Sequence, residues 1–411
     1  MPYSAIYSYD MCYFKSVQRY EQYDITIFIK KAKVFTWSAE ICSARQNATF
    51  HNRMLHFSIL ILSFLWYSFK DCISLFFDKY FPFLKHIQSE SGVHMKSFIC
   101  EMFYKQRAAF EQSCASRGKE YPLPEDVFLQ SDIFYDEKHV PAHRLDVYRP
   151  RGRDGEILPV IVNVHGGGLL IGNKEFNRPF CASLCEAGYL VFSIEYRLIP
   201  DCLFYDQLTD LHLALDFIRD HLTEYGGDIS HIYACGDSGG ACLLTYGIAM
   251  QRSTALAQAA GVTPSDLPVR ALGLVSGMFY TNRLDQIGLF LPRYLYGRHY
   301  KKSAFAPYVS PEHPDIVTSL PPSLLITSDN DNLQSYTLNF EKALRRHQMP
   351  HKLINYPKDP RLTHAFSAFY PDLPESREVI HHLIHFLNIP EMTVKEDTYH
   401  DIRRKCFQRK S

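Results

Sequence analysis

Short hydrophobic runs alternate along the chain with segments whose hydrophobic residues recur at helical spacing. The runs predict buried strands at Val160–Val164, Tyr189–Ile194, His231–Cys235, Ala271–Ser276, Leu324–Thr327 and Lys352–Asn355. The segments with helical spacing predict helices at Arg178–Ala187, Tyr205–His221, Gly240–Gln251, Gln334–His347 and Glu375–Leu387. Strands that alternate with helices predict an α/β fold with a mostly parallel central sheet and helices on both of its faces.

The chain divides into three parts by pattern. Residues 1–94 are rich in Tyr, Phe and Ile and show no alternation of strands and helices, so they are predicted to be an N-terminal extension. Residues 95–390 are the predicted α/β domain, which opens with helical spacing over Met95–Arg117 and an edge strand at His143–Arg149. Gly188 is the predicted C-cap of the helix before it. Residues 391–411 are predicted to be a polar, basic tail.

Charge and cysteine content narrow the class of protein. Lys plus Arg equals Asp plus Glu at 44 each, which gives no indication of a nucleic-acid partner. The 11 cysteines are scattered and show no metal-binding spacing, which favours a reducing, cytoplasmic location without bound metal. The hydrophobic stretch Met54–Phe69 is shorter than the roughly 20 residues of a membrane-spanning helix. It predicts a buried or interfacial helix, with membrane association through residues 54–69 as the alternative.

A possible nucleophile lies between a predicted strand and a predicted helix. The segment Gly236–Gly240 reads Gly-Asp-Ser-Gly-Gly and fits the G-x-S-x-G turn that exposes a serine at the edge of an α/β sheet. Ser238 is therefore the predicted nucleophile, and Gly236 and Gly240 would allow the close backbone approach that this turn needs. The alternative is a glycine-rich turn with an ordinary serine.

A second glycine-rich turn follows the strand Val160–Val164. His165-Gly166-Gly167-Gly168 could direct backbone N–H groups at the oxyanion of an acyl-transfer reaction. A second donor is expected from Gly239, directly after the nucleophile. A phosphate-binding loop is excluded because neither of its glycine patterns is present. His165 is predicted to hold the turn through a side-chain hydrogen bond.

The acid and the base should follow later strands in the order Ser, Asp, His. Asp329 and Asp331 both lie in the loop after Leu324–Thr327, and spacing leaves both open, with Asp331 favoured. His364 is the favoured base because it lies in a loop after the last predicted strand. The alternatives His347 and His351 flank a turn between a helix and a strand, and others lie on the last predicted helix.

Four ordered motifs resemble the hormone-sensitive-lipase-like branch of the α/β-hydrolases, which includes bacterial acetyl esterases and arylacetamide deacetylases. They are His165–Gly168, Glu195–Pro200 with its Tyr-Arg-Leu-Ile-Pro, Gly236–Ser238, and Leu320–Pro322 before the acid strand. The resemblance spans roughly residues 95–390. It implies the α/β-hydrolase fold with a small helical cap, and arylacetamide deacetylases carry an N-terminal membrane anchor in the position of the extension.

The resemblance also implies a mechanism. The nucleophile falls on Ser238, the acid on Asp331 and the base on His364. The oxyanion hole falls on Gly167, Gly168 and Gly239, with Gly166 shaping the loop, and Arg197 and Asp237 would be buried framework. The chain departs from the family in three places. Gly239, Gly240 and Ala241 stand where the family has alanine and two glycines, Asn332 stands in place of proline, and Ala365 stands in place of glycine.

The expected activity is a serine carboxylesterase for short-acyl, acetyl-like esters. It needs a small-molecule ester substrate and no cofactor, while the oligomeric state cannot be read from the sequence. The alternatives are a lipase or amidase on the same fold and a non-catalytic ligand-binding homologue, since fold does not fix function. The aromatic segment Met278–Tyr308 is predicted either to line the pocket or to pack over the sheet edge.

Overall fold

The computed structural model describes residues 100–113, 120–283, 285, 287–288 and 291–388. The predicted extension 1–94, its hydrophobic stretch Met54–Phe69 and the predicted tail 391–411 lie outside these residues. All described residues belong to one compact unit that begins at Lys96. Among the described helices, none combines the length and hydrophobicity needed to cross a membrane. The domain boundary at Met95 stays a prediction.

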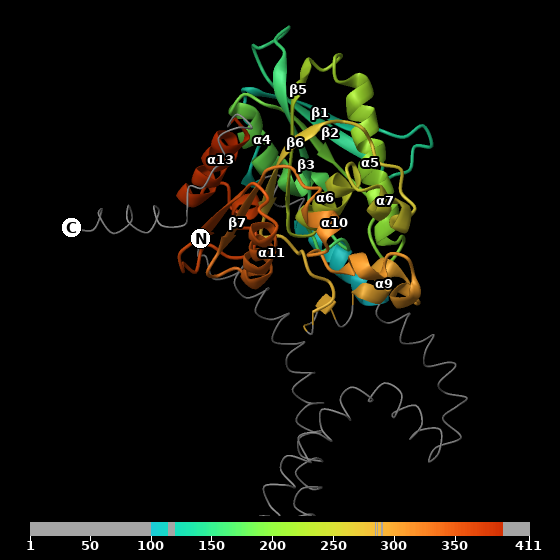
Figure 1. Ribbon diagram of the computed structural model, residues 1–411. Helices are drawn as coiled ribbons and strands as arrows, with labels where there is room; N and C mark the ends of the chain where they lie inside the picture. The colour runs from blue at the N-terminus through green and yellow to red at the C-terminus, as the bar shows by residue number, and fades with distance from the viewer. Residues whose placement is uncertain (1–99, 114–119, 284, 286, 289–290, 389–411) are drawn as a thin grey trace, which may run out of the picture. The chain divides into compact units, whose positions relative to one another are not determined.

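An eight-stranded sheet forms the centre of the described part, in the order β1-β2-β4-β3-β5-β6-β7-β8 (Figure 1). The strands are β1 Val127–Phe134, β2 Arg144–Pro150, β3 Leu158–Val164, β4 Leu190–Ile194, β5 Gly227–Asp237, β6 Val269–Val275, β7 Ser323–Ser328 and β8 His351–Tyr356. The pairs β1–β2 and β2–β4 are antiparallel, and all later pairs are parallel. This is the mostly parallel sheet predicted from the buried hydrophobic runs, and the prediction is confirmed.

Helices cover both faces of the sheet. The longer ones are α4 Arg178–Glu186, α5 Phe204–His221, α6 Ser238–Met250, α7 Thr254–Ala260, α11 Gln334–Arg346 and α13 Pro374–Leu387. Shorter helical segments are η1 Lys174–Asn177, α9 Pro292–Tyr296, η2 Tyr300–Lys302, η3 Ala306–Val309, α10 Pro314–Val317 and α12 Phe366–Phe369. Val160 and Val162 of β3 pack into the core with α5 and α6, whereas Ile161 packs into the core with α4 and α13. Alternate residues of one strand thus pack into two different hydrophobic cores, one on each face of the sheet.

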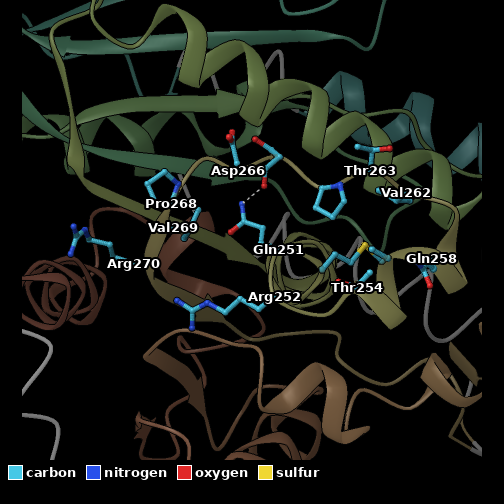
Figure 2. A pocket seen from close by; sticks show the side chains of 14 residues that line it. Gln251, Arg252, Thr254, Gln258, Val262, Thr263, Asp266, Pro268, Val269 and Arg270 are labelled. Carbon is cyan, nitrogen blue, oxygen red and sulfur yellow. Dashed lines mark hydrogen bonds between the residues drawn. The ribbon is translucent and has the colours of Figure 1, made fainter.

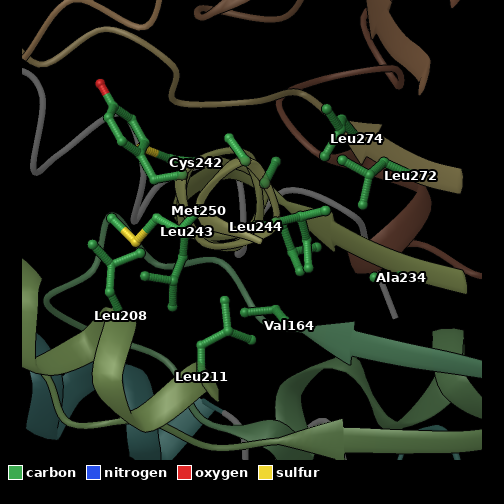
Figure 3. Packing of buried hydrophobic residues seen from close by; sticks show 14 of the residues in the cluster. Val164, Leu208, Leu211, Ala234, Cys242, Leu243, Leu244, Met250, Leu272 and Leu274 are labelled. Carbon is green, nitrogen blue, oxygen red and sulfur yellow. The ribbon is translucent and has the colours of Figure 1, made fainter. Parts of the chain in front are cut away.

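The helix α6 is buried along its whole length. Figure 3 shows it surrounded by side chains of the neighbouring strands and of α5, among them Val164, Leu211 and Leu274. Every residue of α6 from Ser238 to Met250 is buried, so this helix has no polar face. A helix that is hydrophobic on all sides is stable only inside a protein, and its N-terminal end is fixed by this packing.

Three local predictions need correction. The strand predicted at the edge, His143–Arg149, is the second strand, because β1 pairs along its outer side. The C-cap of α4 is Ala187, and Gly188 follows it with a φ of 98° that favours glycine. No separate turn lies at Gly236–Gly239, where one was predicted, because β5 runs to Asp237 and α6 begins at the next residue, Ser238.

A small group of helical segments lies beside the sheet. Residues 100–113 form a helix inside the predicted Met95–Arg117, and Figure 1 shows it next to α9. The rings of Phe103 and Tyr294 meet edge to face, with centroids 5.2 Å apart. In the predicted aromatic segment, Tyr296 and Phe305 are buried and pack with Phe204 of α5. For these two residues the structure favours the packing alternative over a pocket wall.

Candidate active site

The predicted nucleophile lies at the junction of β5 and α6. Ser238 is the first residue of α6, and its φ of 49° places a residue other than glycine in the left-handed region. Such strain is concentrated at functional sites, where the surrounding structure enforces it. The hydroxyl stands at the helix N-terminus, where unpaired N–H groups favour negative charge. The residue is only 6% exposed.

The glycines on either side of Ser238 allow β5 and α6 to approach β3. A Cβ atom on Gly236 would lie 2.7 Å from the carbonyl oxygen of Val164. A Cβ atom on Gly240 would lie 2.1 Å from the same oxygen and 2.6 Å from that of His165. Real Cβ atoms do not come so close to backbone, so both positions require glycine. The sharp turn therefore depends on the two glycines that the sequence motif contains.

His364 lies beside Ser238 in the loop between β8 and α12. Its Nε2 is 2.9 Å from Ser238 Oγ, and its Nδ1 is 2.7 Å from Asp331 Oδ1. A carboxylate can only accept, so Nδ1 carries the proton and Nε2 is left to accept from the serine hydroxyl. The next residue, Ala365, has a φ of 50°, a backbone conformation that L residues rarely adopt.

Asp331 follows β7 and is held by several donors. Its Oδ1 also accepts from the Leu333 N–H at 2.8 Å, and its Oδ2 accepts from the Thr327 hydroxyl at 2.9 Å. Burial acts to raise the pKa of Asp331, but hydrogen bonds from His364 and other donors outweigh it and hold that pKa below its usual value. The carboxylate is therefore charged at neutral pH, as a partner for an imidazolium must be.

The competing aspartate lies elsewhere in the same loop. Asp329 is exposed, and its carboxylate accepts from the side-chain amides of Gln334 and Asn355 at 2.7 and 2.8 Å. Asp331, not Asp329, thus contacts His364. The histidines at 347 and 351 are likewise apart from this group, since His351 pairs with Glu341 on α11.

The glycine turn after β3 lies against the start of α6. Gly167 and Gly168 both have left-handed backbone, with φ of 97° and 62°, and a Cβ atom on Gly167 would lie 2.0 Å from the Ile171 carbonyl oxygen. A Cβ atom on Gly239 would lie 3.0 Å from the Gly168 nitrogen and 2.8 Å from the Leu169 nitrogen. The backbone nitrogens of the turn therefore lie close to the start of α6. Gly166 differs, because its N–H donates to Asp237 Oδ1 at 3.0 Å.

Buried polar side chains fix this turn from behind. Asp237 Oδ1 accepts from Gly166 and from the Asn177 amide, and burial raises the pKa of Asp237. His165 donates from Nδ1 to the Gly166 carbonyl oxygen, and burial lowers the pKa of His165 to about 4, so the ring is neutral near pH 7. The Gln207 amide donates to the Leu169 carbonyl oxygen at 2.9 Å.

The expectation for Arg197 is wrong in one respect. Its side chain is 33% exposed rather than buried, and its guanidinium binds the buried carboxylate of Asp210 on α5. The arginine therefore connects the segment after β4 to α5 from the outside, because a charged group that reaches water avoids most of the cost of burial. Asp237, in contrast, is buried as expected.

Several supporting residues were not predicted from the sequence. Asn177, Gln207 and Ser276 are single polar residues, and nothing in their neighbourhood marks them. Thr327 carried a weak signal, since a hydroxyl residue at the carboxyl end of a buried strand faces the site edge of a parallel sheet. Their roles follow from contacts between distant segments, which no local pattern records.

A pocket of about 720 Å³ lies at the other end of α6 (Figure 2). It is lined by Gln251, Arg252, Asp266 and Arg270, among others, and by none of the predicted site residues. Within the described part of the chain, no group of three or more His, Cys, Asp or Glu side chains could hold a metal ion.

Parts of the chain are similar in sequence to known proteins. A family model named BD-FAE matches residues 145–265. A probable isoprenylcysteine alpha-carbonyl methylesterase of Arabidopsis thaliana is 29% identical over 240 residues, covering 56% of this chain and 50% of that protein. The carboxylic ester hydrolase LipN of Mycobacterium tuberculosis is 28% identical over 219 residues, covering 50% of this chain and 56% of that protein. The chain thus matches only about half the length of these relatives.

Solved structures give the same fold. Esterase B of Lactobacillus rhamnosis, in an inhibited form, superposes with a TM-score of 0.65 at 24% identity, covering 70% of this chain and 94% of that one. At this identity the likeness shows the fold alone. The chain therefore has the α/β-hydrolase fold and, over about half of its length, is similar in sequence to carboxylic ester hydrolases.

Proposed function

We propose that this chain is a serine carboxylesterase that hydrolyses short-acyl, acetyl-like esters. The observation that carries the proposal is the continuous hydrogen-bond path from Ser238 through His364 to Asp331. Nucleophile, base and orienting acid within hydrogen-bond reach are what acyl transfer requires. The homology to carboxylic ester hydrolases supports the same reaction class.

In the first half of the proposed reaction, Ser238 attacks the ester. Its hydroxyl proton passes to His364 Nε2 while Oγ forms a bond to the carbonyl carbon. The charge moves to the carbonyl oxygen, where the N–H groups of Gly167, Gly168 and Gly239 would stabilise it. Asp331 stabilises the imidazolium. The imidazolium then gives its proton to the leaving alcohol as the ester C–O bond breaks, which leaves an acyl-enzyme.

In the second half, water takes the place of the alcohol. His364 accepts a proton from water as its oxygen attacks the acyl carbon, and a second oxyanion forms against the same donors. Breakdown of this intermediate releases the carboxylic acid and returns the proton to Ser238. Every proton in the cycle is carried by His364, so the proposed mechanism uses no cofactor.

The proposed preference for small acyl groups draws support from access to the nucleophile. Ser238 is 6% exposed, and Leu169 and Met278 beside it are buried hydrophobic residues. The backbone N–H of Met278 donates to the Ser238 carbonyl oxygen at 2.9 Å, so this side chain starts directly at the site. A buried, apolar surrounding favours an uncharged ester with a small acyl group.

The test is a panel of p-nitrophenyl esters of increasing acyl length, with methyl esters and anilides of the same acids, on the full chain. We expect hydrolysis of acetyl and propionyl esters that a serine-directed phosphonate abolishes, and none in Ser238→Ala. Faster anilide hydrolysis would indicate an amidase, and a rate that needs long chains and an interface would indicate a lipase. Stoichiometric ligand binding without turnover would indicate a non-catalytic homologue and overturn the proposal.

A further inference from the structure

Ser276 lies at the end of β6, in register with the nucleophile at the end of β5. Asp237 pairs with Val275 in the parallel ladder, and each of these residues is the last of its strand, so the residue after each strand is a serine at the carboxyl end of the sheet. Both serines have a φ of 49°, in the left-handed region. Ser276 is 1% exposed. A strained, buried serine directly beside the nucleophile calls for a functional explanation.

The backbone around Ser276 joins the nucleophile to the acid strand. The Ser276 N–H donates to the carbonyl oxygen of Ile326 on β7 at 2.8 Å. Two residues later, the Met278 N–H donates to the Ser238 carbonyl oxygen at 2.9 Å. The short segment from Ser276 to Met278 is thus bonded on one side to the strand that leads to Asp331 and on the other to the serine turn.

The Ser276 side chain contacts the loop that carries His364. Its Oγ accepts the backbone N–H of Ala365, the residue directly after His364, at 3.0 Å across 89 positions of sequence. A hydroxyl that accepts this bond still has its own proton to donate. Burial raises the pKa of Asp331, and hydrogen bonds from His364 and from the Ser276 side chain lower it. The Ser276 hydroxyl thus binds the loop that carries the base, and it acts to lower the pKa of Asp331.

We propose that Ser276 is a positioning residue for ester hydrolysis, holding His364 in line with Ser238 and Asp331 through its hydroxyl. The inference rests on the proposed function. The left-handed backbone turns the hydroxyl toward the loop of His364, and the loss of that bond would leave the buried Ala365 N–H without a partner. A base that shifts by a fraction of an ångström loses rate in the chemical step while substrate binding stays intact.

The decisive variant is Ser276→Gly in the full chain. Glycine adopts a φ of 49° without strain, so this change removes the hydroxyl and keeps the backbone. With p-nitrophenyl acetate we expect kcat to fall roughly 10- to 100-fold, with KM nearly unchanged. Inactivation by a serine-directed phosphonate should slow by a similar factor, because it uses the same nucleophile and base. Ser276→Ala should lose a similar factor in kcat and more thermal stability.

The matched control is Ser323→Ala. Ser323 is also fully buried, but its hydroxyl donates to the Pro321 carbonyl oxygen at the start of β7. This position lies at the amino ends of the parallel strands, away from the carboxyl ends where Ser238 and Ser276 lie. We expect this variant to lose stability and to keep kcat. All rates are divided by the number of active sites titrated with the phosphonate, so that a partly unfolded preparation is not counted as a slow enzyme.

Two outcomes overturn the inference and leave the proposed function standing. One is an unchanged kcat per titrated site in Ser276→Gly. The other is an increase in KM with kcat intact, which would make Ser276 part of the pocket wall. If the wild-type chain shows no hydrolysis that depends on Ser238, the proposed function itself fails. Only the wild type and Ser238→Ala are compared for this test, so it is independent of the Ser276 variants.

Discussion

The imidazole Nε2 of His364 lies 2.9 Å from the hydroxyl oxygen of Ser238, although 126 positions separate the two residues in the sequence. Ser238 stands at the end of a central strand, and His364 is in a loop after the strand at the sheet edge. Their contact means that the loop crosses the carboxyl ends of β6 and β7. Ligands and catalytic groups of open α/β sheets gather at this edge.

We expect Ser238→Ala and His364→Ala to lower kcat/KM for acetyl esters by similar factors, on the order of 10⁴ or more. The double variant should be little worse than either single one, because nucleophile and base act as a unit. Steady-state kinetics on purified variants with matching circular dichroism spectra provide the measurement. Losses that multiply in the double variant would show that the two residues act independently.

Asp331→Asn should impair hydrolysis by up to about 10⁴-fold, because an amide neither fixes the imidazole tautomer nor stabilises the imidazolium. Asp329→Asn is its control in the same loop and should keep most of its activity, since its carboxylate contacts Gln334 and Asn355 instead. Comparing the kcat values of the two variants shows which aspartate acts as the acid. The reverse order would assign the acid role to Asp329.

Gly239→Ala should lower kcat by roughly 10- to 100-fold, because the new Cβ would displace the N–H groups that face the oxyanion. Its Cβ would lie 2.8 Å from the Leu169 nitrogen and 3.0 Å from that of Gly168. Gly261→Ala is the matched control, since Gly261 follows α7 and a Cβ there meets nothing within 4 Å. The control should lose some stability through its left-handed backbone and keep full activity. Equal kcat values in the two variants would contradict the proposed oxyanion hole.

The free energy of unfolding should fall as the pH drops from about 6.5 to about 4, partly through His212. Burial lowers the pKa of His212 to about 4, so the unfolded chain takes up a proton in this range and the folded chain does not. The contribution of His212 is present above pH 6.5 and disappears toward pH 4, and it amounts to about 3 kcal/mol. His143 acts with the opposite sign, since its pKa is raised, and its effect lies at higher pH.

The variant His212→Asn isolates this contribution. The amide oxygen can replace Nδ1, which accepts the Ser265 N–H at 3.1 Å, but it does not titrate. Urea unfolding between pH 4 and 7 should show a lower stability at neutral pH and a flatter dependence on pH than in the wild type. Parallel curves for the two proteins would mean that His212 is not the group that takes up the proton.

A shortened chain that begins at Met95 should fold and keep its ester hydrolysis, as predicted from the sequence. The described contacts sharpen this test, because the Arg107 guanidinium donates to the carbonyl oxygens of Leu170 and Ile199 and pairs with Asp201. A chain that begins at Glu120 lacks these contacts to the segment after the glycine turn, and we expect it to lose stability and kcat. The thermal midpoints and kcat/KM of both shortened chains are measured and compared with those of the full chain. An insoluble or inactive chain from Met95 would move the boundary toward the N-terminus.

The sequence alone determined the fold class and the residues that are candidates for the proposed reaction. Buried strands of a parallel sheet are short continuous hydrophobic runs, and those runs gave β3 to β8 to within a few residues, because burial on both faces leaves no other pattern. The glycines at 236 and 240 were also readable, since a close backbone approach excludes every side chain. The edge strand was misassigned because β1, partly exposed, lacks such a run.

Only the tertiary structure decided how these groups meet. Asp329 and Asp331 are two residues apart and chemically identical, so spacing left both open although it favoured Asp331, whereas the turn after β7 directs only Asp331 to His364. Ser276 and Gln207 carried no local signal, because their partners lie 89 and 38 positions away. Sequence patterns report the periodicity of burial, while the contacts that orient a catalytic group form between segments that folding brings together.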